Sequence, residues 1–115
     1  MLRGELGENN VKTLDARHLR ADVLRWLGEY EVARTEIEEV IRKREQHPAL
    51  GPDDSDTLKS RHIHTYILRH LGEYEAALAE IKEVIRKQRQ SHSLGPDHPD
   101  TLTNRYGSVR PLYGD

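Results

Sequence analysis

Residues 27–46 read LGEYEVARTEIEEVIRKREQ, and residues 71–90 read LGEYEAALAEIKEVIRKQRQ. Apolar residues recur in each stretch at steps of three and four, which places them on one face of an α-helix. These residues are Tyr30, Ala33, Ile37, Val40 and Ile41 in the first stretch, and Tyr74, Ala77, Ile81, Val84 and Ile85 in the second. Arg and Lys gather near the end of each stretch, as the helix dipole favours. The sequence therefore predicts two copies of one amphipathic helix, over 29–46 and 73–90.

A different amphipathic helix precedes each of these stretches. Its apolar residues are Leu14, Leu19, Ala21, Val23, Leu24 and Leu27 in the first half of the chain. The matching residues in the second half are Leu58, Ile63, Thr65, Ile67, Leu68 and Leu71, which are apolar except for Thr65. Asn10 and Asp54 are good N-cap residues, and Gly28 and Gly72 readily adopt the left-handed conformation that commonly ends a helix. We therefore expect two further helices, each antiparallel to the helix that follows after one or two residues. Their expected spans are 10–27 and 54–71.

The two helices form a unit that returns every 44 residues. Aligning 6–49 with 50–93 without a gap gives 22 identical residues in 44 positions. Such self-similarity at a fixed period is the signature of a repeat architecture. We therefore expect two full repeats at these positions and a truncated third repeat at 94–115.

The third unit follows the repeat only as far as Arg105. After that residue, Gly107 and Pro111 interrupt the helical pattern. Because a proline inside a helix costs about 3 kcal/mol, we expect a short fifth helix that starts near His98 and ends early.

The composition excludes several classes of protein. The chain has 115 residues, a formal net charge of −2 and no cysteine. We expect one domain, 1–115, without disulfides, a cysteine-ligated zinc site or a thiol nucleophile. No apolar run approaches the roughly 20 residues that a membrane span needs, no signal peptide is visible, and the balance of charge gives no bulk attraction to nucleic acid or lipid. A soluble cytoplasmic protein is expected.

Seven histidines raise the question of a metal site. His62 and His64 are two residues apart, so on a helix they point in different directions, and His18 has only Asp22 as a second potential ligand one turn away. The acidic residues of the loops suit turns and caps better than a calcium site, which needs more oxygen ligands. The sequence also lacks a Gly-rich phosphate loop and a Ser/His/Asp set. We therefore expect no catalytic residue, no metal and no cofactor.

The Leu-Gly-Glu-Tyr turn followed by Ala-x-x-x-Ile resembles the tetratricopeptide repeat. The pattern of the second helix in that family falls on Gly28, Tyr30, Ala33 and Ile37, and again on their copies 44 residues later. The segment LGPDHPDTL at 94–102 is similar to the long-repeat, kinesin-light-chain-like subclass. The resemblance covers 6–105. It implies an all-α fold in which antiparallel helical hairpins stack as a short right-handed solenoid.

Two features depart from the family pattern. The period of 44 residues is longer than is usual for the family. Arg20 and His64 occupy the position that usually holds a buried leucine of the first helix. We expect Leu19 and Ile63 to be buried in their place.

The resemblance also implies a function. Tetratricopeptide proteins are generally non-catalytic scaffolds that bind peptides in a groove lined by their first helices. The residues that match the groove positions are His18, Asp22, Arg25, Trp26, His62, Tyr66, Arg69 and His70. Cationic and aromatic side chains of this kind suit an acidic peptide or a C-terminal carboxylate. We therefore expect a protein–protein interaction module that binds a protein or peptide partner.

Other interpretations of these groove residues remain open. They also fit a solvated helix face, and Trp26 can instead pack on the N-terminal segment 1–9. Nucleic acid binding is not favoured, because the basic groups are few and the chain is acidic overall. The chain can also be a fragment of a larger signalling or regulatory protein.

The ends of the repeat array suggest a second class of function, a self-assembling structural element. In a stacked array each unit buries its apolar face on the next, so the last unit needs a cap or a partner. We expect a homodimer through the open repeat ends or a native partner at the C-terminal end, with Leu112 and Tyr113 as a makeshift cap in the alternative. Arg17, Arg61 and Arg105 keep one register in the three units, and we expect them to tie each unit to the next.

Overall fold

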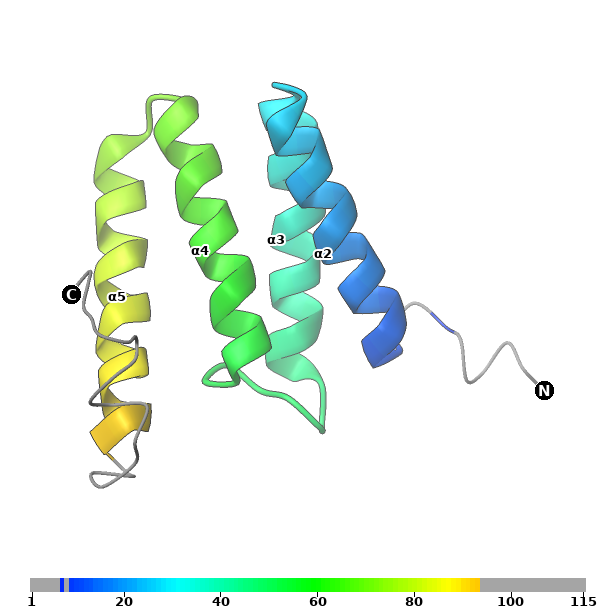
Figure 1. Cartoon of the computed structure of the whole chain (residues 1–115), viewed down its shortest axis with the longest axis vertical. Coiled ribbons are helices and arrows are strands. Elements are labelled where there is room, and N and C mark those ends of the chain that lie inside the picture. The colour runs from blue at the N-terminus through cyan, green and yellow to red at the C-terminus, as the bar shows by residue number, and fades with distance from the viewer. Residues whose placement is uncertain (1–6, 8, 94–115) are drawn as a thin grey trace, which may run out of the picture. The chain divides into compact units, whose positions relative to one another are not determined.

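The computed structural model describes residue 7 and residues 9–93, with side chains through residue 90. Its helices are α2 (Val11–Trp26), α3 (Tyr30–Gln46), α4 (Ser55–His70) and α5 (Tyr74–Ser93) (Figure 1). These residues include no β-strand, and none of the helices is long and apolar enough to cross a membrane. The predicted all-α fold is confirmed, and the helix ends agree with the predicted ends to within one residue, except that α5 continues to Ser93. The fifth helix predicted near His98 lies outside the described residues.

Contacts within the chain divide it into two compact units, Met1–Val84 and Ile85–Asp115. The first unit contains α2, α3, α4 and the N-terminal half of α5, and the described part of the second unit is the rest of α5. The features analysed below lie in the first unit. A single domain with a truncated third repeat stays a prediction.

The caps and turns that were predicted from the sequence are confirmed in both repeats. The side chain of Asn10 accepts a hydrogen bond from the backbone N–H of Lys12 at 2.8 Å, and Asp54 does the same for Asp56 at 2.8 Å. Each such cap stabilises a helix by about 1 kcal/mol. Gly28 and Gly72 have φ angles of 81° and 83°, in the left-handed region where a side chain would be strained. Each hairpin is therefore closed by the same local chemistry.

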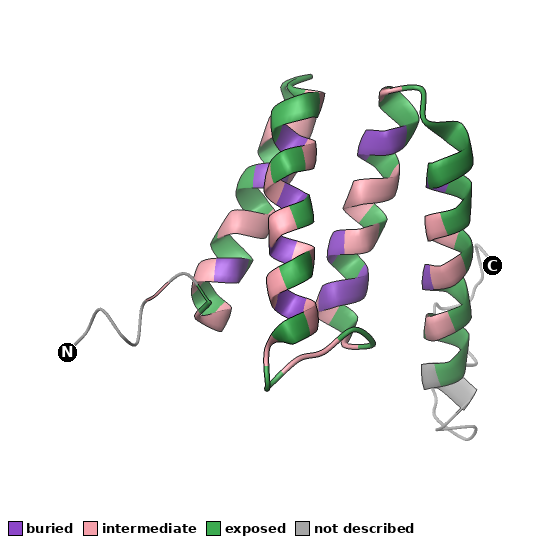
Figure 2. Cartoon of the chain, turned by 180° about the vertical axis from the view of Figure 1, so that it is seen from behind, coloured by how far each residue is buried: buried purple, intermediate pink, exposed green. Residues whose placement is uncertain are grey.

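The core forms where α2, α3 and α4 meet. Its fully buried residues are Ala21, Ala33, Ile37, Val40 and Ile67, and Leu24, Tyr30, Ile41, Ile63 and Leu71 pack against them. Figure 2 shows the buried residues of α3 and α4 in purple. Ala21 and Ala33 have no exposed surface. Their small side chains allow α2 and α3 to approach each other closely. This cluster therefore joins the first repeat to the second.

Three apolar residues that were predicted in the core are exposed on α2. The exposed fractions of Leu19, Val23 and Leu27 are 61%, 49% and 70%. No described helix precedes α2, whereas α3 covers the corresponding side of α4. The prediction that Leu19 is buried in place of Arg20 is therefore wrong. The same prediction for Ile63 is correct, because Ile63 packs against the core.

The predicted apolar face of the last helix is also partly open. Tyr74 is 66% exposed and Ile85 is 39% exposed, although their copies in α3 pack against the core. Val84 is buried within its own hairpin. The difference arises because α3 is followed by α4, which covers it.

Two arginines with the same register hold the hairpins together. Arg17 Nε lies 3.1 Å from Glu36 Oε2, and Arg61 Nε lies 3.2 Å from Glu80 Oε2. Both ion pairs join the two helices of one hairpin. The prediction that these arginines tie one unit to the next is therefore wrong, and Arg105 lies outside the described residues.

The tie between the repeats is made by Arg44, which is only 3% exposed. Its Nη1 donates to the backbone oxygen of Asp56 at 2.6 Å and to the hydroxyl of Ser60 at 3.0 Å, both on α4. Its Nη2 donates to Asp15 of α2 at 2.8 Å. One guanidinium therefore connects three helices. The sequence pattern had assigned Arg44 only to the charged end of α3.

Candidate functional site

The first helices of the two repeats, α2 and α4, present an aromatic and cationic surface that crosses from one repeat to the other. The guanidinium carbon of Arg25 on α2 lies 4.8 Å from the ring centre of Tyr66 on α4 and 4.9 Å from that of Trp26. The guanidinium carbon of Arg69 lies 5.7 Å from the Tyr66 ring. We call Arg25, Trp26, Tyr66 and Arg69 the aromatic strip. A cation over the face of an aromatic ring at these distances is attracted to the ring, and these contacts order the side chains of the strip.

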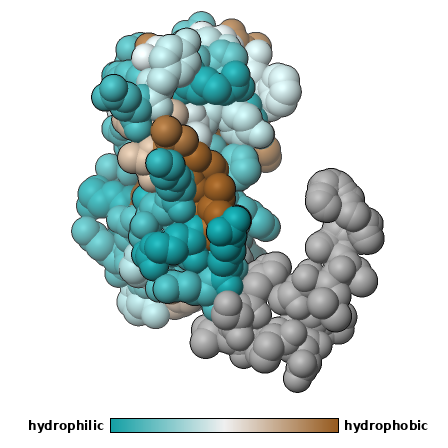
Figure 3. Space-filling model, turned by 90° about the vertical axis from the view of Figure 1, so that its left-hand side faces the viewer, coloured by the Kyte–Doolittle hydropathy of each residue, from teal (hydrophilic) through white to brown (hydrophobic). Residues whose placement is uncertain are grey.

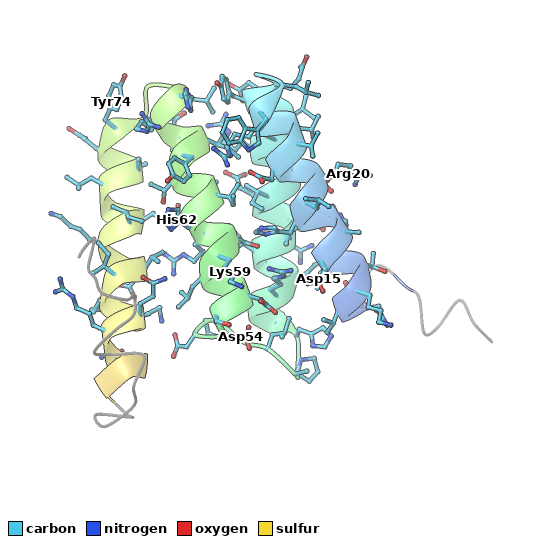
Figure 4. All side chains as sticks on the ribbon, viewed as in Figure 1. Asp15, Arg20, Asp54, Lys59, His62 and Tyr74 are labelled. Atoms are coloured by element: carbon cyan, nitrogen blue, oxygen red, sulfur yellow. The ribbon has the colours of Figure 1, made fainter. Side chains whose placement is uncertain are left out.

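Two further predicted residues support the strip. Asp22 Oδ1 accepts hydrogen bonds from Nε and Nη2 of Arg25 at 3.0 and 2.6 Å, so it fixes the plane of the guanidinium between the two rings. The ring of His62 lies 5.1 Å from that of Tyr66 (Figure 4 labels His62 on α4). Six of the eight residues predicted from the sequence are therefore brought together.

The other two predicted residues do not join the strip. His18 lies between α2 and α4, where its Nδ1 is 2.7 Å from the hydroxyl of Ser60. Burial, followed by the positive charge of Arg44, lowers the pKa of His18 below its ordinary value, against the nearby carboxylates. The ring of His70 stacks on Tyr30 of α3 with centres 4.5 Å apart and an angle of 7°. Both side chains make contacts between the repeats, and their assignment to the groove stays a prediction.

The strip is accessible. Trp26 is 75% exposed and Tyr66 is also exposed, whereas the side chain of Arg25 is 13% exposed and already paired with Asp22. Among the described residues, Arg69 has no ion pair with a carboxylate. Arg69 is therefore the cation that remains for an acidic partner, and the two aromatic rings are the apolar contact surfaces. The alternative position of Trp26, against segment 1–9, involves residues that are mostly outside the described part of the chain.

A hollow that the sequence did not predict lies between α3, α4 and α5. It has a volume of about 580 Å³, and its lining residues are Glu38, Ile41, Arg42, Glu45, Arg61, His64, Ala76, Ala79 and Glu80. His64 bridges two carboxylates there: its Nε2 is 2.9 Å from Glu38 of α3, and its Nδ1 is 2.5 Å from Glu80 of α5. The only hint in the sequence was a polar residue, His64, where the family has leucine.

The charge state of His64 follows from these two neighbours. Burial alone would lower the pKa of His64, but the hydrogen bonds and negative charges of Glu80 and Glu38 outweigh it and hold the pKa above its ordinary value. His64 therefore links the first repeat to the second through its contacts with Glu38 and Glu80, and these contacts favour its protonated form. Within residue 7 and residues 9–93, no group of three or more His, Cys, Asp or Glu side chains is arranged to hold a metal ion.

Comparison with known proteins identifies part of the chain. The family model described as tetratricopeptide repeat matches residues 65–100, which cover the C-terminal part of α4, all of α5 and the residues that follow. Neither the comparison with curated proteins nor the comparison with solved structures gave a match. Repeats of this family generally mediate protein–protein interactions, and they are non-catalytic modules.

Proposed function

Residues 65–100 are a tetratricopeptide repeat, and from this we propose that the chain binds a protein or peptide partner through the aromatic strip on α2 and α4. The observation that carries the proposal is the position of Arg25, which is held by Asp22 and lies between Trp26 and Tyr66 across two repeats. Tyr, Trp and Arg are the residues that contribute most to binding free energy at protein interfaces. A prearranged group of them on an exposed face loses little side-chain entropy when a partner binds.

The chemistry of the strip favours an acidic segment. A carboxylate of the partner can accept hydrogen bonds from the guanidinium of Arg69, and charge-assisted hydrogen bonds of this kind are stronger than neutral ones. The exposed rings of Trp26 and Tyr66 can cover an apolar side chain beside that carboxylate. The proposed ligand is therefore a peptide in which an acidic group is next to an apolar residue, either within a chain or at a C-terminus.

The proposal is tested with synthetic peptides. An array of acidic peptides with free and amidated C-termini is screened with the purified protein, and the best peptide is titrated while the fluorescence of Trp26, the single tryptophan of the chain, is followed. Tyr66→Ala and Arg69→Gln are each expected to weaken binding by about tenfold or more, as removal of an interface hot spot does. The melting temperature of both variants should stay close to that of the unmodified protein.

Lys59→Gln is the matched control, because it removes one positive charge from an exposed position on α4, outside the strip (Figure 4). It is expected to leave the affinity unchanged. Equal losses in Arg69→Gln and Lys59→Gln would show that binding depends on the general charge of the surface and would contradict the proposal. A single-stranded oligonucleotide in the same titration tests the nucleic acid alternative.

A further inference from the structure

Helix α2 carries an exposed apolar stripe. Leu19, Val23 and Leu27 are four residues apart, so their side chains lie on one face of the helix. All three are exposed. Exposed apolar groups that form a contiguous row commonly mark an interaction site.

The second repeat shows what this stripe is built to contact. The copies of Leu19, Val23 and Leu27 are Ile63, Ile67 and Leu71 of α4. These copies pack against the buried residues of α3, and Ile67 is completely buried there. The stripe on α2 therefore matches one half of the interface that joins the two repeats, and residues 9–93 contain no counterpart that covers it.

The other half of the same interface is exposed on α5. Tyr74 and Leu78 are exposed, and Ile81 is half-buried. Figure 3 shows an apolar patch, in brown, on the side of the molecule where α5 lies, and Figure 4 labels Tyr74 on the first turn of this helix. The copies of Tyr74 and Ile81 in α3 are Tyr30 and Ile37, which contact α4 or are completely buried.

We propose that a second copy of the chain docks its α2 on α5 of the first copy, in the way that α4 docks on α3 within one chain. The interface is heterologous, because it joins two different surfaces, so each copy keeps one free half and the association continues head to tail. The proposed interface shares Trp26 with the aromatic strip, whereas Tyr66 lies outside the interface. The inference therefore goes beyond the proposed function and can fail or hold independently of it.

The sequence of the C-terminal segment does not repeat the apolar residues of the stripe, and the cap predicted at Leu112 and Tyr113 lies outside the described residues. In the register of the repeat, the positions of Ile63, Ile67 and Leu71 fall in that segment on Gly107, Pro111 and Asp115. None of these residues offers a large apolar side chain. A second copy of α2 does, at each of the three positions.

The repeat register also predicts which residues meet across the interface. Tyr30 stacks on His70 within the chain, so Tyr74 of one copy would meet Trp26 of the next, and two exposed aromatic rings would be covered together. Glu38 pairs with His64 within the chain. At the corresponding positions Lys82 would meet Arg20, which is an unfavourable contact between like charges.

The arrangement is tested by sedimentation velocity with one variant for each half of the interface. Val23→Lys places a charge in the middle of the α2 stripe, and Leu78→Glu places a charge on α5; both positions are exposed. Each variant alone is expected to associate about tenfold or more weakly than the unmodified chain, because a charge would be buried without a partner. The unmodified chain should form species larger than a dimer as its concentration rises to high micromolar.

An equimolar mixture of the two variants is the decisive sample. Val23→Lys keeps an intact α5 and Leu78→Glu keeps an intact α2, so the mixture should form a one-to-one dimer and grow no further. A symmetric dimer that uses the same face of both copies would instead be disrupted by only one of the two variants. Mixing that variant with the other would not restore its association. An unmodified chain that stays monomeric, or a mixture that stays monomeric, would overturn the proposal. Far-UV circular dichroism establishes that each variant is folded.

A substitution that strengthens the interface gives an independent test. Lys82→Glu introduces the residue that Glu38 provides in the first repeat, opposite Arg20 of the next copy. It is expected to tighten self-association by about three- to tenfold, which corresponds to a favourable surface ion pair in place of a repulsive contact. Lys59→Glu makes the same change of charge away from the interface and should have no effect. Tyr66→Ala should weaken peptide binding by about tenfold or more and leave self-association intact, which separates this inference from the proposed function.

Discussion

At the residue scale, the contact with the largest expected effect on stability is that of Arg44. It is a charged side chain within the interface between the repeats, and its two terminal nitrogens hold acceptors on α2 and α4. A buried cation is tolerated only where hydrogen bonds and opposite charge replace the water that it loses. Asp15, Ser60 and the backbone oxygen of Asp56 replace that water at the two terminal nitrogens, whereas Nε is buried without a hydrogen-bond partner among the described residues.

Arg44→Ala is expected to lower the free energy of unfolding by about 2–4 kcal/mol, because it removes charge-assisted hydrogen bonds and leaves their acceptors without a donor. Urea denaturation measures the change. Arg42→Ala is the matched control on the same helix, since Arg42 is exposed and pairs with Glu39 one turn away. A loss no greater than that of the control would contradict the role of Arg44.

The bridge formed by His64 makes stability depend on pH. The folded state raises the pKa of His64 above 6.5, so the folded chain binds this proton more tightly than the unfolded chain does. The stabilisation is therefore complete below pH 6.5 and is lost as the pH rises through the pKa of the folded state. The charged groups that line this hollow together with the imidazole are Glu38, Arg42, Glu45, Arg61 and Glu80.

His64→Gln should remove this dependence. Urea denaturation at a series of pH values is expected to show a difference between the unmodified chain and the variant that is largest in acid and shrinks above pH 6.5. His18→Asn provides a control of opposite sign, because the pKa of His18 is lowered and its protonation opposes folding as the pH falls below 6.5. A constant difference for His64→Gln across the series would contradict the assignment.

At the element scale, the hairpins depend on close approach between their two helices. Ala33 is completely buried in the core that α3 shares with α2 and α4. Ala33→Leu is expected to lower the free energy of unfolding by about 1–3 kcal/mol through overpacking. Ala16→Leu makes the same substitution at an exposed position of α2 and should change stability by less than about 0.5 kcal/mol. Chemical denaturation of the two variants at low protein concentration tests the comparison.

The elements themselves could be predicted from the sequence because their signals are local. The helix boundaries follow from the spacing of apolar residues and from Asn10, Asp54, Gly28 and Gly72, whose effects reach only a few residues. Exposure could not be predicted in the same way. Val23 and Ile67 have the same place in the pattern, yet one is exposed and the other is buried, because burial depends on whether another helix lies beside them.

In the candidate site, too, positions along a helix could be predicted from the sequence, whereas contacts between helices could not. The first-helix positions of the family located the strip, and Asp22, Arg25, Trp26, His62, Tyr66 and Arg69 do lie together. The contacts of His18 and His70 could not be predicted, because their partners, Ser60 and Tyr30, are on other helices. The role of Arg44 was missed because its burial arises from contacts with two helices that are distant in sequence.

At the scale of the whole molecule, the inferred self-association makes thermal stability depend on concentration. Association of folded chains stabilises the folded state by mass action. Differential scanning calorimetry is expected to show a melting temperature that rises with protein concentration for the unmodified chain and stays constant for Val23→Lys. A melting temperature that rises equally in both would show that association does not use the α2 stripe.

The interface made by Arg44 also restricts how such a chain could have been lengthened by gene duplication. The copies of Arg44 and Asp15 in the second repeat are Gln88 and Lys59, and the copy of Ser60 in the first repeat is Ala16. A tandem duplicate of 50–93 would therefore meet its neighbour without the guanidinium and without its carboxylate. The two units are similar in sequence but no longer interchangeable, and their order along the gene is part of what makes the chain fold as one connected set of hairpins.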